Sequence, residues 1–452
     1  MRVRLAATQS MSRFPGPKSR PLLEELARYV VAEPNPFVVD LEHSHGMVLV
    51  TIDGDELFDW AGYYGSRLLG HNHQGLFEAD YQHRLLIAAN NKIPNPDFLS
   101  ADCLEYYRLM YSLAPACMRR DSLEIYVVNS GAEAVENMMK YLIARHREKA
   151  ELSGKIPQQR RFVYFDRGFH GRTLGALNVT HLVHAPLVTK DFAELMPGNL
   201  RLPFPHLDNS RSAADNESEV TRCLDCVRKS LEDFRGEIVA ILVEPIQGAG
   251  GHRLALPRFF RELSAMAAVH EVFLAFDEVQ TAGGQCGSLF ALDLFDLPHP
   301  PEAVAVAKKF GNGVLYMRQS LRDIGVLDST WGGSLTDMVR VVQEFRIVER
   351  EGLMSAVATK GERLGEGLLA LERRYSDFVF NVRGMGLYQG FSIREPADRD
   401  RLLTLALERE RLLLLGAGGQ SIRLRPPLDV SLEEIDELLA RLERVLAMLS
   451  DS

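Results

Sequence analysis

Short apolar runs alternate with segments of helical period along most of the chain. The runs are rich in Val, Ile, Phe and Ala, and between them apolar residues recur every three or four positions, as on one face of a helix. Strands that alternate with helices form mainly parallel sheets with helices on both faces. We predict central strands at residues 124–129, 162–166, 238–244, 272–277 and 303–307, and helices at 132–147, 223–234 and 258–269.

The N-terminal part has shorter elements. Its pattern predicts a tail, then a helix at 22–32 and strands at 37–41, 47–52 and 56–59. Asp53-Gly54 predicts a hairpin turn between the last two strands, because glycine accepts the positive φ of a tight turn.

The pattern changes again after residue 335. It predicts a long helix to about residue 375, interrupted near Glu351-Gly352, followed by a mixture of strands at 378–383, 388–393 and 421–424 and a helix at 398–411. Ser431 and Glu434 predict a capping box at the start of a final helix, since each side chain can bond the other residue's backbone N–H. We therefore divide the chain into an N-terminal segment at 1–74, a large α/β domain at 75–335 and a small α+β domain at 336–452.

Composition limits the function classes. The 52 Lys and Arg against 61 Asp and Glu give a net charge of −9, which lacks the basic surface of a nucleic-acid binder. No apolar run approaches the roughly 18 residues of a membrane-spanning helix. Five cysteines, an odd number, favour a reducing compartment, so we expect a cytoplasmic protein. The basic first twenty residues leave a targeting segment as the alternative to a flexible tail.

Candidate chemistry lies at the ends of the predicted strands, where ligands of parallel sheets bind. The strand at 272–277 ends in Asp277, followed by Val279 and Gln280 after one further acid. A carboxylate beside an apolar strand is costly unless it meets a cation or a ligand nitrogen. Lys308 and Lys309 follow the strand at 303–307, ahead of a glycine-rich stretch that suits a lysine held close to a ligand. Surface acids and surface lysines are the alternatives for these positions.

A phosphate site is predicted where a strand leads into a helix at Ser130, Gly131 and Ala132. Ser130 and Glu133 form a second predicted capping box, and the free N–H groups at a helix start attract anions. An ordinary capped helix is the alternative. The Walker A and dinucleotide glycine patterns are absent from the sequence, which disfavours a P-loop or a Rossmann cofactor.

Further candidates follow other strand ends. Phe169 could cover a flat ring, and Arg172 could grip a carboxylate with its planar fork. Glu244 ends the strand at 238–244, Thr330 precedes the long helix, and Arg423 lies on the strand at 421–424. A phosphate cup, a ring-covering aromatic, an acid for a pyridine nitrogen and a lysine together form the set that a pyridoxal phosphate site needs.

These segments resemble the class III (ω-amino acid) aminotransferases, which are pyridoxal phosphate enzymes of fold type I. The resemblance runs from about residue 40 to residue 446 and is carried by the stretches SGAEAVE, FHGRTLG, EPIQGAGG, FDEVQT, AKKFGNG and STWGG. Within this class the chain is most similar to the L-lysine 6-transaminases, through residues 91–97 and 329–340, and next to the 4-aminobutyrate transaminases. The resemblance implies an α/β fold with a large, mainly parallel sheet flanked by helices and a smaller α+β domain.

The resemblance implies a cofactor role for each matching position. Lys308 aligns with the Schiff-base lysine, with Lys309 as the fallback, and Asp277 with the acid that keeps the pyridine nitrogen protonated. The implied ring and phosphate contacts are Gln280 on the 3-hydroxyl oxygen, Val279 and Phe169 on the two ring faces, His170 beside them, and Ser130, Gly131 and Ala132 on the phosphate. Thr330 would reach the phosphate of a partner subunit, which implies a homodimer with shared active sites.

Three further positions imply the substrates. Arg172 matches the arginine for the distal carboxylate, and Arg423 the arginine for the α-carboxylate of 2-oxoglutarate. Glu244 matches the acid that pairs with that arginine while the first substrate is bound. The resemblance thus implies a ping-pong transaminase that moves a terminal amino group from L-lysine to 2-oxoglutarate, giving the semialdehyde and glutamate. A transaminase for 4-aminobutyrate or another ω-amino acid and a pyridoxal phosphate aminomutase are the alternatives.

Some segments depart from the family pattern. Residues 248–251 read GAGG where GEGG is common, and residues 282–287 and 310–317 also differ, which leaves the amino donor open. Cys223 and Cys226 are not accompanied by a second cysteine pair or a well-spaced histidine, so we predict no metal site.

Overall fold

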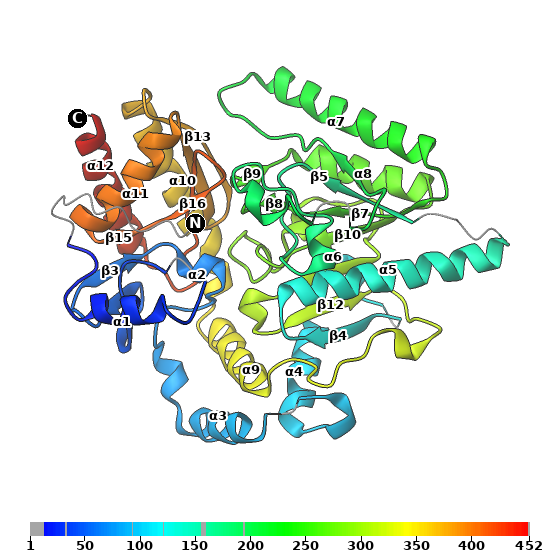
Figure 1. Ribbon diagram of the computed structural model, residues 1–452, viewed down its shortest axis with the longest axis horizontal. Helices are drawn as coiled ribbons and strands as arrows, with labels where there is room; N and C mark the ends of the chain where they lie inside the picture. Colours follow the sequence, from blue (N-terminus) through cyan, green and yellow to red (C-terminus); the bar gives the residue numbers. More distant parts are fainter. Residues whose placement is uncertain are drawn as a thin grey trace.

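The computed structural model describes residues 13–31, 34–92, 94–120, 122–154, 160–192 and 195–450. A seven-stranded sheet with its helices forms one half of the molecule, on the right of Figure 1, and a second group of strands and helices from both ends of the chain lies beside it on the left. The predicted helix at 22–32 falls partly outside the described residues. Its described counterpart, α1 (Ser19–Leu26), begins and ends earlier than the pattern predicts.

The large sheet is mainly parallel. Its strands, in spatial order, are β4 (Glu124–Val128), β12 (Gly313–Met317), β11 (Ala303–Val306), β10 (Phe273–Asp277), β7 (Ile238–Val243), β5 (Arg161–Phe165) and β6 (Leu200–Leu202). β12 is antiparallel to both of its neighbours, and the remaining pairs are parallel. The α/β prediction is therefore confirmed. The sequence analysis did not predict β12. Its residues are all apolar, so apolar and polar positions do not alternate, and the strand follows closely on the glycines after Lys309.

Helices cover both faces of this sheet. α5 (Gly131–Ser153) packs on one face, while α8 (Pro257–Val269) and α7 (Ala213–Asp233) lie on the other. The side chains of β11 show how the faces differ: Ala303 and Ala305 belong to the core under α5, and Val304 and Val306 to the opposite core. Successive side chains of a strand point to opposite faces, so small residues on one side allow α5 to approach closely.

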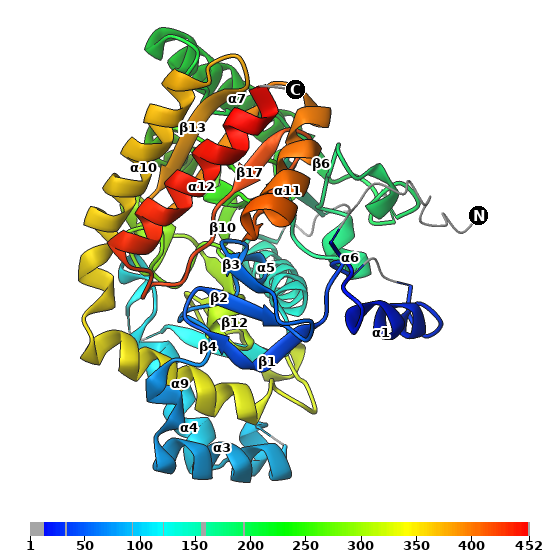
Figure 2. The same ribbon diagram turned by 90° about the vertical axis from the view of Figure 1, so that its left-hand side faces the viewer.

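The C-terminal part is a sheet covered by three helices. Its strands, in spatial order, are β13 (Val379–Met385), β14 (Tyr388–Ile393), β17 (Ser421–Arg423) and β16 (Leu415–Ala417). The helices α10 (Val357–Arg374), α11 (Pro396–Glu410) and α12 (Leu432–Ser450) lie in front of it in Figure 2. The predicted capping box at α12 is confirmed, since Ser431 N–H donates to Glu434 Oε2 at 2.7 Å and Glu434 N–H to Ser431 Oγ at 3.1 Å.

The N-terminal strands join the C-terminal part. β1 (Val39–His45), β2 (Val48–Thr51) and β3 (Glu56–Asp59) are antiparallel, with Gly54 at φ +87° in the predicted hairpin turn. β3 then pairs in parallel with β15 (Leu412–Leu413), more than 350 residues further along the chain. The two ends of the chain therefore build one layer.

The remaining helices and strands connect these parts. α3 (Ala79–Asn91) and α4 (Ala101–Ser112) pack against α9 (Leu335–Arg350), at the bottom of Figures 1 and 2. The predicted break in the long helix is confirmed, because α9 ends before Gly352, which has φ +61°. The short elements are α2 (Gly62–Gly65), α6 (Leu174–Leu177), β8 (Ile246–Gln247), β9 (Arg253–Leu254) and 3₁₀ turns at Gln74–Phe77, Pro96–Phe98, Ala116–Met118, Pro186–Val188, Ala291–Leu294, Lys308–Phe310, Ile324–Val326 and Leu353–Ala356.

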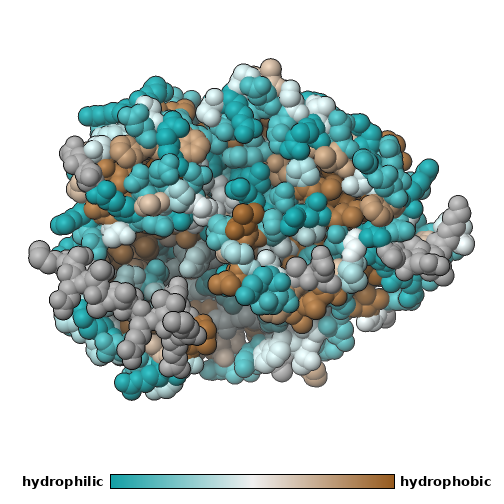
Figure 3. Space-filling model, turned by 45° about the horizontal axis from the view of Figure 1, so that its top comes forward, coloured by the Kyte–Doolittle hydropathy of each residue, from teal (hydrophilic) through white to brown (hydrophobic). Residues whose placement is uncertain are grey.

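Hydrophilic residues cover most of the face shown in Figure 3, and hydrophobic residues form scattered patches between them. Among the described helices, none is both long and apolar enough to cross a bilayer.

Candidate active site

A cavity of about 790 Å³ opens where the parallel strands end. The segments that follow β4, β5, β7, β10 and β11 all reach this edge of the sheet, because parallel strands present their carboxyl ends on the same side. Of the thirteen predicted site residues, twelve line the cavity: Ser130, Gly131, Ala132, Phe169, His170, Arg172, Glu244, Asp277, Val279, Gln280, Lys308 and Arg423.

Thr330 is the predicted residue that does not line the cavity within the described chain. Its position is exposed, and its carbonyl oxygen accepts a hydrogen bond from Asn95 Nδ2 at 3.3 Å. A contact between Thr330 and the phosphate in a partner subunit stays a prediction.

Asp277 and His170 form a buried pair at the floor of the cavity. His170 Nδ1 lies 2.7 Å from Asp277 Oδ2, and Asp277 Oδ1 accepts the N–H of Val279 at 3.0 Å. Burial alone would lower the pKa of His170, but the hydrogen bond and the charge of Asp277 outweigh burial and raise this pKa above its usual range. The pair therefore places at the cavity a carboxylate that is hydrogen-bonded to a histidine whose protonated form is favoured.

Lys308 reaches the cavity from a 3₁₀ turn directly after β11. Its φ of +50° is uncommon for a residue with a side chain, and such backbone strain is concentrated at functional sites. Burial, followed by the charges of Arg423 and Arg425, lowers the pKa of Lys308 to about 8, although Asp277 opposes the shift. Near pH 7 about a tenth of this amine is therefore uncharged, far more than for an ordinary lysine, and the uncharged amine is the nucleophile.

Lys309 has a different environment, although it is the next residue. It is buried outside the cavity lining, and its Nζ donates to the carbonyl oxygens of Gln280 at 2.6 Å and Gly65 at 3.2 Å and to Tyr388 Oη at 2.6 Å. Its three donors are thus used to join segments on two sides of the cavity. This arrangement favours Lys308 over Lys309 as the lysine that meets a ligand.

The start of α5 provides a place for a phosphate. Ser130 Oγ accepts the N–H of Glu133 at 3.3 Å, as predicted for a capping box, but the Glu133 carboxylate accepts the N–H of Asn129 at 2.7 Å instead of that of Ser130. The Ser130 N–H therefore takes no part in the capping box, and Ser130 lines the cavity. A side chain at Gly131 would come within 2.6 Å of Val279 Cγ1, so only glycine allows the helix start to lie this close to the cavity floor.

Gln280 lies between the cavity and two arginines. Its Oε1 accepts from Arg425 Nη2 at 3.2 Å and from Arg423 Nη1 at 3.4 Å. Because arginine only donates, this contact fixes the oxygen toward the arginines and leaves the amide NH₂ as a donor for a ligand. The predicted contact of Gln280 with a ring oxygen needs such a donor.

Arg423 is a buried cation with spare donors. It is 7% exposed, its Nε has no partner among the described residues, and burial together with the charge of Arg425 lowers its pKa to about 9. Glu244, the predicted partner, forms no ion pair with it in the described part of the chain. Glu244 Oε1 accepts instead the N–H of Phe169 at 2.8 Å, and burial raises the pKa of Glu244 to about 8. Arg423 is therefore open to a substrate carboxylate in this structure.

Arg172 lies at the rim of the cavity. Its side chain is exposed, and it has no hydrogen-bond or ion-pair partner among the residues that the structure describes. The cavity thus has one guanidinium deep inside, on Arg423, and one near solvent.

The sequence prediction missed a wall of the cavity formed by Tyr63 and Tyr64. These residues lie in α2, a left-handed turn in which Gly62, Tyr63, Tyr64 and Gly65 have φ values of +54°, +48°, +61° and +78°. A left-handed conformation costs roughly 1–2 kcal/mol for each residue with a side chain, so the surroundings must hold the two tyrosines in place.

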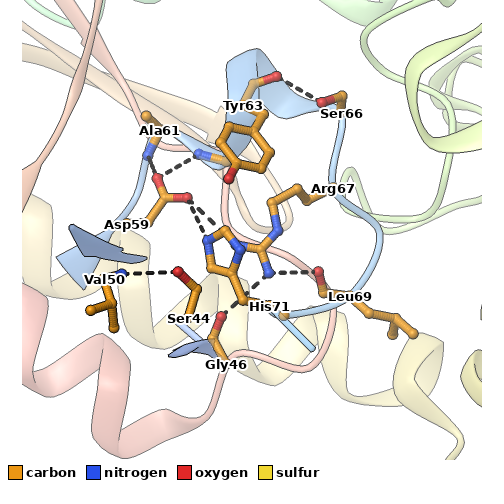
Figure 4. A network of polar contacts seen from close by, with 12 residues as sticks. Ser44, Gly46, Val50, Asp59, Ala61, Tyr63, Ser66, Arg67, Leu69 and His71 are labelled. Carbon is orange, nitrogen blue, oxygen red and sulfur yellow. Dashed lines mark hydrogen bonds and ion pairs between the residues drawn. The ribbon is translucent and has the colours of Figure 1, made fainter. Parts of the chain in front are cut away.

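A polar network under the turn supplies part of this support (Figure 4). Asp59 Oδ1 accepts the N–H groups of Ala61 at 3.0 Å and Gly62 at 2.9 Å, while its Oδ2 lies 3.3 Å from His71 Nε2 and 3.5 Å from Arg67 Nη1. The Tyr63 ring packs edge-on against His71, with centroids 5.5 Å apart. The glycines at both ends of the Tyr-Tyr pair are the sequence signal that could have revealed this turn.

No group of His, Cys, Asp and Glu side chains suited to a metal ion occurs in the described ranges. Cys223 is buried in the core and Cys226 is partly buried, and both lie on α7, as expected for an ordinary helix face.

Comparison with known proteins identifies the class. Residues 29–446 match the family Aminotransferase class-III, so the chain belongs to the class-III aminotransferases. These enzymes use pyridoxal phosphate, and their reaction implies an amino donor and a keto acceptor. The groups that line the cavity fit this cofactor. They are the amine of Lys308, the buried carboxylate of Asp277, the helix start at Gly131 and the free amide NH₂ of Gln280.

Individual relatives narrow the class to the ω-amino acid transaminases. The L-lysine-epsilon aminotransferase of Mycobacterium tuberculosis is 32% identical over 442 residues, covering 94% of this chain and 95% of the relative. The mitochondrial 4-aminobutyrate aminotransferase of Mus musculus is 29% identical over 446 residues, covering 92% of this chain and 86% of the relative. A solved structure, the lysine aminotransferase from M. tuberculosis in the internal aldimine form, has a TM-score of 0.89 at 29% identity and covers 95% of this chain and 99% of its own. The fold is therefore that of the fold type I aminotransferases.

Proposed function

We propose that this ω-amino acid transaminase moves the ε-amino group of L-lysine to 2-oxoglutarate, giving the semialdehyde and glutamate. The observation that carries the proposal is Arg423, a buried guanidinium in the cavity that has no carboxylate partner among the described residues. A buried charge without a partner is costly, so a substrate carboxylate is the expected occupant. The relatives named for lysine support this donor, and those named for 4-aminobutyrate make that compound the alternative.

Bound pyridoxal phosphate supplies an electron sink for the carbon that carries the reacting amine. Lys308 would hold the cofactor and, as a free amine, would take the proton from the substrate carbon, because its lowered pKa suits a general base. Asp277, hydrogen-bonded to His170, would face the pyridine nitrogen and favour its protonated form. Gln280 would offer its NH₂ to the ring oxygen, and the N–H groups at the start of α5 would hold the phosphate.

Two guanidinium groups sort the two substrates by charge. 2-Oxoglutarate has two carboxylates, which match Arg423 in the depth of the cavity and Arg172 at its rim. Lysine enters with its ε-amine toward Lys308 and its single carboxylate toward Arg172. Glu244 then moves to Arg423 and neutralises it, so that the uncharged part of the lysine chain does not lie beside a bare cation.

An amino-donor comparison tests this proposal. The purified enzyme receives 2-oxoglutarate with lysine, ornithine, 4-aminobutyrate or β-alanine, and glutamate is measured. We expect the highest kcat/KM with lysine and no glutamate from the Lys308→Ala variant. A higher kcat/KM with 4-aminobutyrate would favour that alternative, and isomerisation of lysine without any acceptor would indicate an aminomutase.

We also propose a homodimer in which Thr330 of each subunit completes the partner's phosphate site. Thr330 is exposed and lies outside the cavity of its own chain in the described residues, which supports a role across an interface. Mixing Lys308→Ala and Thr330→Ala subunits tests this arrangement, because a mixed dimer contains one complete site. Activity that exceeds the sum of the two separate variants is expected, and a simple sum would contradict the proposal.

A further inference from the structure

A second cavity, of about 430 Å³, lies behind the active site at the boundary between the large sheet and the C-terminal sheet. Ala249 lines the active-site cavity, while the next two residues, Gly250 and Gly251, line the second one. Gly418 crosses at this point, with its N–H on the Ala249 carbonyl oxygen at 3.1 Å, and His184 lines both cavities. The two cavities are therefore back to back, separated by the contact of two glycine-rich loops.

Positive charge dominates the lining of this second cavity. Arg167 and Arg253 reach it from the large domain and Arg383 from β13, and none of the three forms an ion pair within the described ranges. The acidic residue among the described lining positions is Asp208, which lies 3.6 Å from Arg211. The cavity thus has more positive than negative groups.

Arg383 supplies buried charge rather than free donors. It is 4% exposed, and its guanidinium donates to the carbonyl oxygens of His252 and Gly251, each at 2.6 Å, and to Ser421 Oγ at 2.8 Å. Further bonds go to the carbonyl oxygen of Asn381 and to a serine hydroxyl, so its acceptors are all neutral. Its hydrogen bonds are satisfied, but its charge has no ion-pair partner in the described ranges and is offset only from a distance, by Asp208 and Glu372.

Arg253 and Arg167 have donors to spare. Arg253 Nη1 donates to Gln247 Oε1 at 2.8 Å and to the Asp166 carbonyl oxygen at 3.2 Å, and its Nη2 to the Phe204 carbonyl oxygen at 3.2 Å. Its Nε–H and one further N–H have no partner among the described residues. The exposed Arg167 side chain has no partner in the same part of the chain.

The second cavity therefore resembles the active site around Arg423. In both places a buried guanidinium has no ion-pair partner among the described residues, and an anion that binds there would offset the cost of burying the charge. We propose that the second cavity binds a small dianion, either inorganic phosphate or a short dicarboxylate, held by the free donors of Arg167 and Arg253 and by the charge of Arg383. Charge-assisted bonds to guanidinium groups recognise both kinds of anion.

Occupation of this site would join the two domains next to the active site. Arg167 and Arg253 belong to the large sheet, whereas Gln420 and Ser421 line the opposite side of the cavity from the C-terminal sheet. Arg167 also lies two residues before Phe169, which lines the active-site cavity. The dianion thus fixes the position of the C-terminal sheet relative to the Phe169 loop.

Calorimetric titration of the holoenzyme tests the proposal. The cofactor is first fixed by borohydride reduction, so that the phosphate cup of the active site is occupied. Inorganic phosphate, succinate and acetate are then titrated at constant ionic strength near neutral pH. We expect phosphate, succinate or both to bind, and acetate to bind at least about tenfold more weakly because it has one charge.

Two variants with matched controls locate the binding. Arg167→Gln removes a free donor, and Arg28→Gln is its control, because Arg28 is exposed, lies outside the cavity lining and likewise forms no ion pair within the described ranges. Gly419→Glu places a carboxylate in the cavity without a clash, since a Cβ there meets nothing within 4 Å, and Gly419→Gln is its uncharged control. Both test variants should weaken binding at least about tenfold, while the controls bind as the unaltered enzyme does.

Each result bears on the proposal. Loss of phosphate binding, of succinate binding or of both in the two test variants supports the site and shows which anions it accepts. Absence of binding at millimolar concentrations overturns the proposal. Binding that is unchanged in both Arg167→Gln and Gly419→Glu also overturns it, because the anion then occupies the active site or another surface. The test does not depend on the identity of the amino donor.

Discussion

The lowered pKa of Lys308 makes an unusual stability prediction. In the cofactor-free protein, Lys308 Nζ has no hydrogen-bond partner among the described residues and is surrounded by the charges of Arg423 and Arg425. Lys308→Met keeps the length of the side chain and removes the amine. We expect this variant to be more stable than the unaltered protein near neutral pH, because functional groups in active sites are commonly held at a cost to stability.

The size of the gain follows from the pKa. Lys308 has a pKa of about 8 in the folded protein and an ordinary value of 10.5 when unfolded. Each unit corresponds to about 1.4 kcal/mol, so the charged amine destabilises the fold by about 3 kcal/mol. The folded protein binds this proton more weakly than the unfolded chain. The cost is therefore complete below pH 8, shrinks as the pH rises from about 8 to 10.5, and is absent above that range.

Thermal unfolding of the cofactor-free protein measures this effect. Lys308→Met should raise Tm by a few degrees at neutral pH, and the difference should disappear toward pH 10.5. Lys190→Met, at an exposed position, is the matched control and should leave Tm nearly unchanged. A lower Tm for Lys308→Met at neutral pH, or a difference that stays constant across the pH range, would refute the reasoning.

Three other substitutions separate backbone, packing and electrostatic effects. Gly62→Ala should lower Tm more than Gly54→Ala, although both glycines have positive φ. A Cβ at Gly62 would lie 2.1 Å from the Arg425 carbonyl oxygen, whereas a Cβ at Gly54 would meet nothing within 4 Å. An equal fall in Tm for the two variants would show that the positive φ, and not the clash, sets the loss of stability. Lys309→Met should lower Tm, opposite to Lys308→Met, because it leaves buried acceptors unsatisfied at about 1–3 kcal/mol each; a higher Tm would show that relief of the buried charge dominates. Asp277→Asn should weaken cofactor binding at least about tenfold in equilibrium dialysis, since it removes the charged partner of His170, and unchanged binding would contradict the proposed ring contact.

Residues that follow strands were predictable from the sequence, because the topology brings the carboxyl ends of parallel strands to one edge. Asp277 ends β10, while Glu244 and Lys308 follow β7 and β11, and the structure places all three around one cavity. The alternation of short strands and helices was enough to predict this edge. The individual hydrogen-bond partners were harder to predict. In the capping box at Ser130, for example, the Glu133 carboxylate accepts the N–H of Asn129 and not that of Ser130.

Features that depend on distant segments could not be predicted from local patterns. Lys308 and Lys309 are identical in type and adjacent, and only the surrounding carbonyl groups make one a cavity residue and the other an internal crosslink. Tyr63 and Tyr64 would be expected in an ordinary loop. The flanking glycines signal a turn, but the local pattern does not show what holds it: Asp59, at the end of β3, accepts the Gly62 N–H, and β3 itself pairs with β15 near the other end of the chain.

The pairing of β3 with β15 has a consequence for how the enzyme is made. Phe58 N–H donates to the Arg411 carbonyl oxygen at 2.7 Å and Trp60 N–H to that of Leu413 at 3.0 Å, directly before the turn that carries Tyr63. At ribosomal rates of roughly 5–20 residues per second, the later strand follows the earlier one by about 20–70 s. During this interval the N-terminal hairpin has an unpaired edge. The strands of the large sheet are therefore synthesised well before β15. The cavity wall formed by Tyr63 and Tyr64 can be completed only when the last tenth of the chain has been made. Protection of the unpaired edge by chaperones until then would raise the yield of active enzyme.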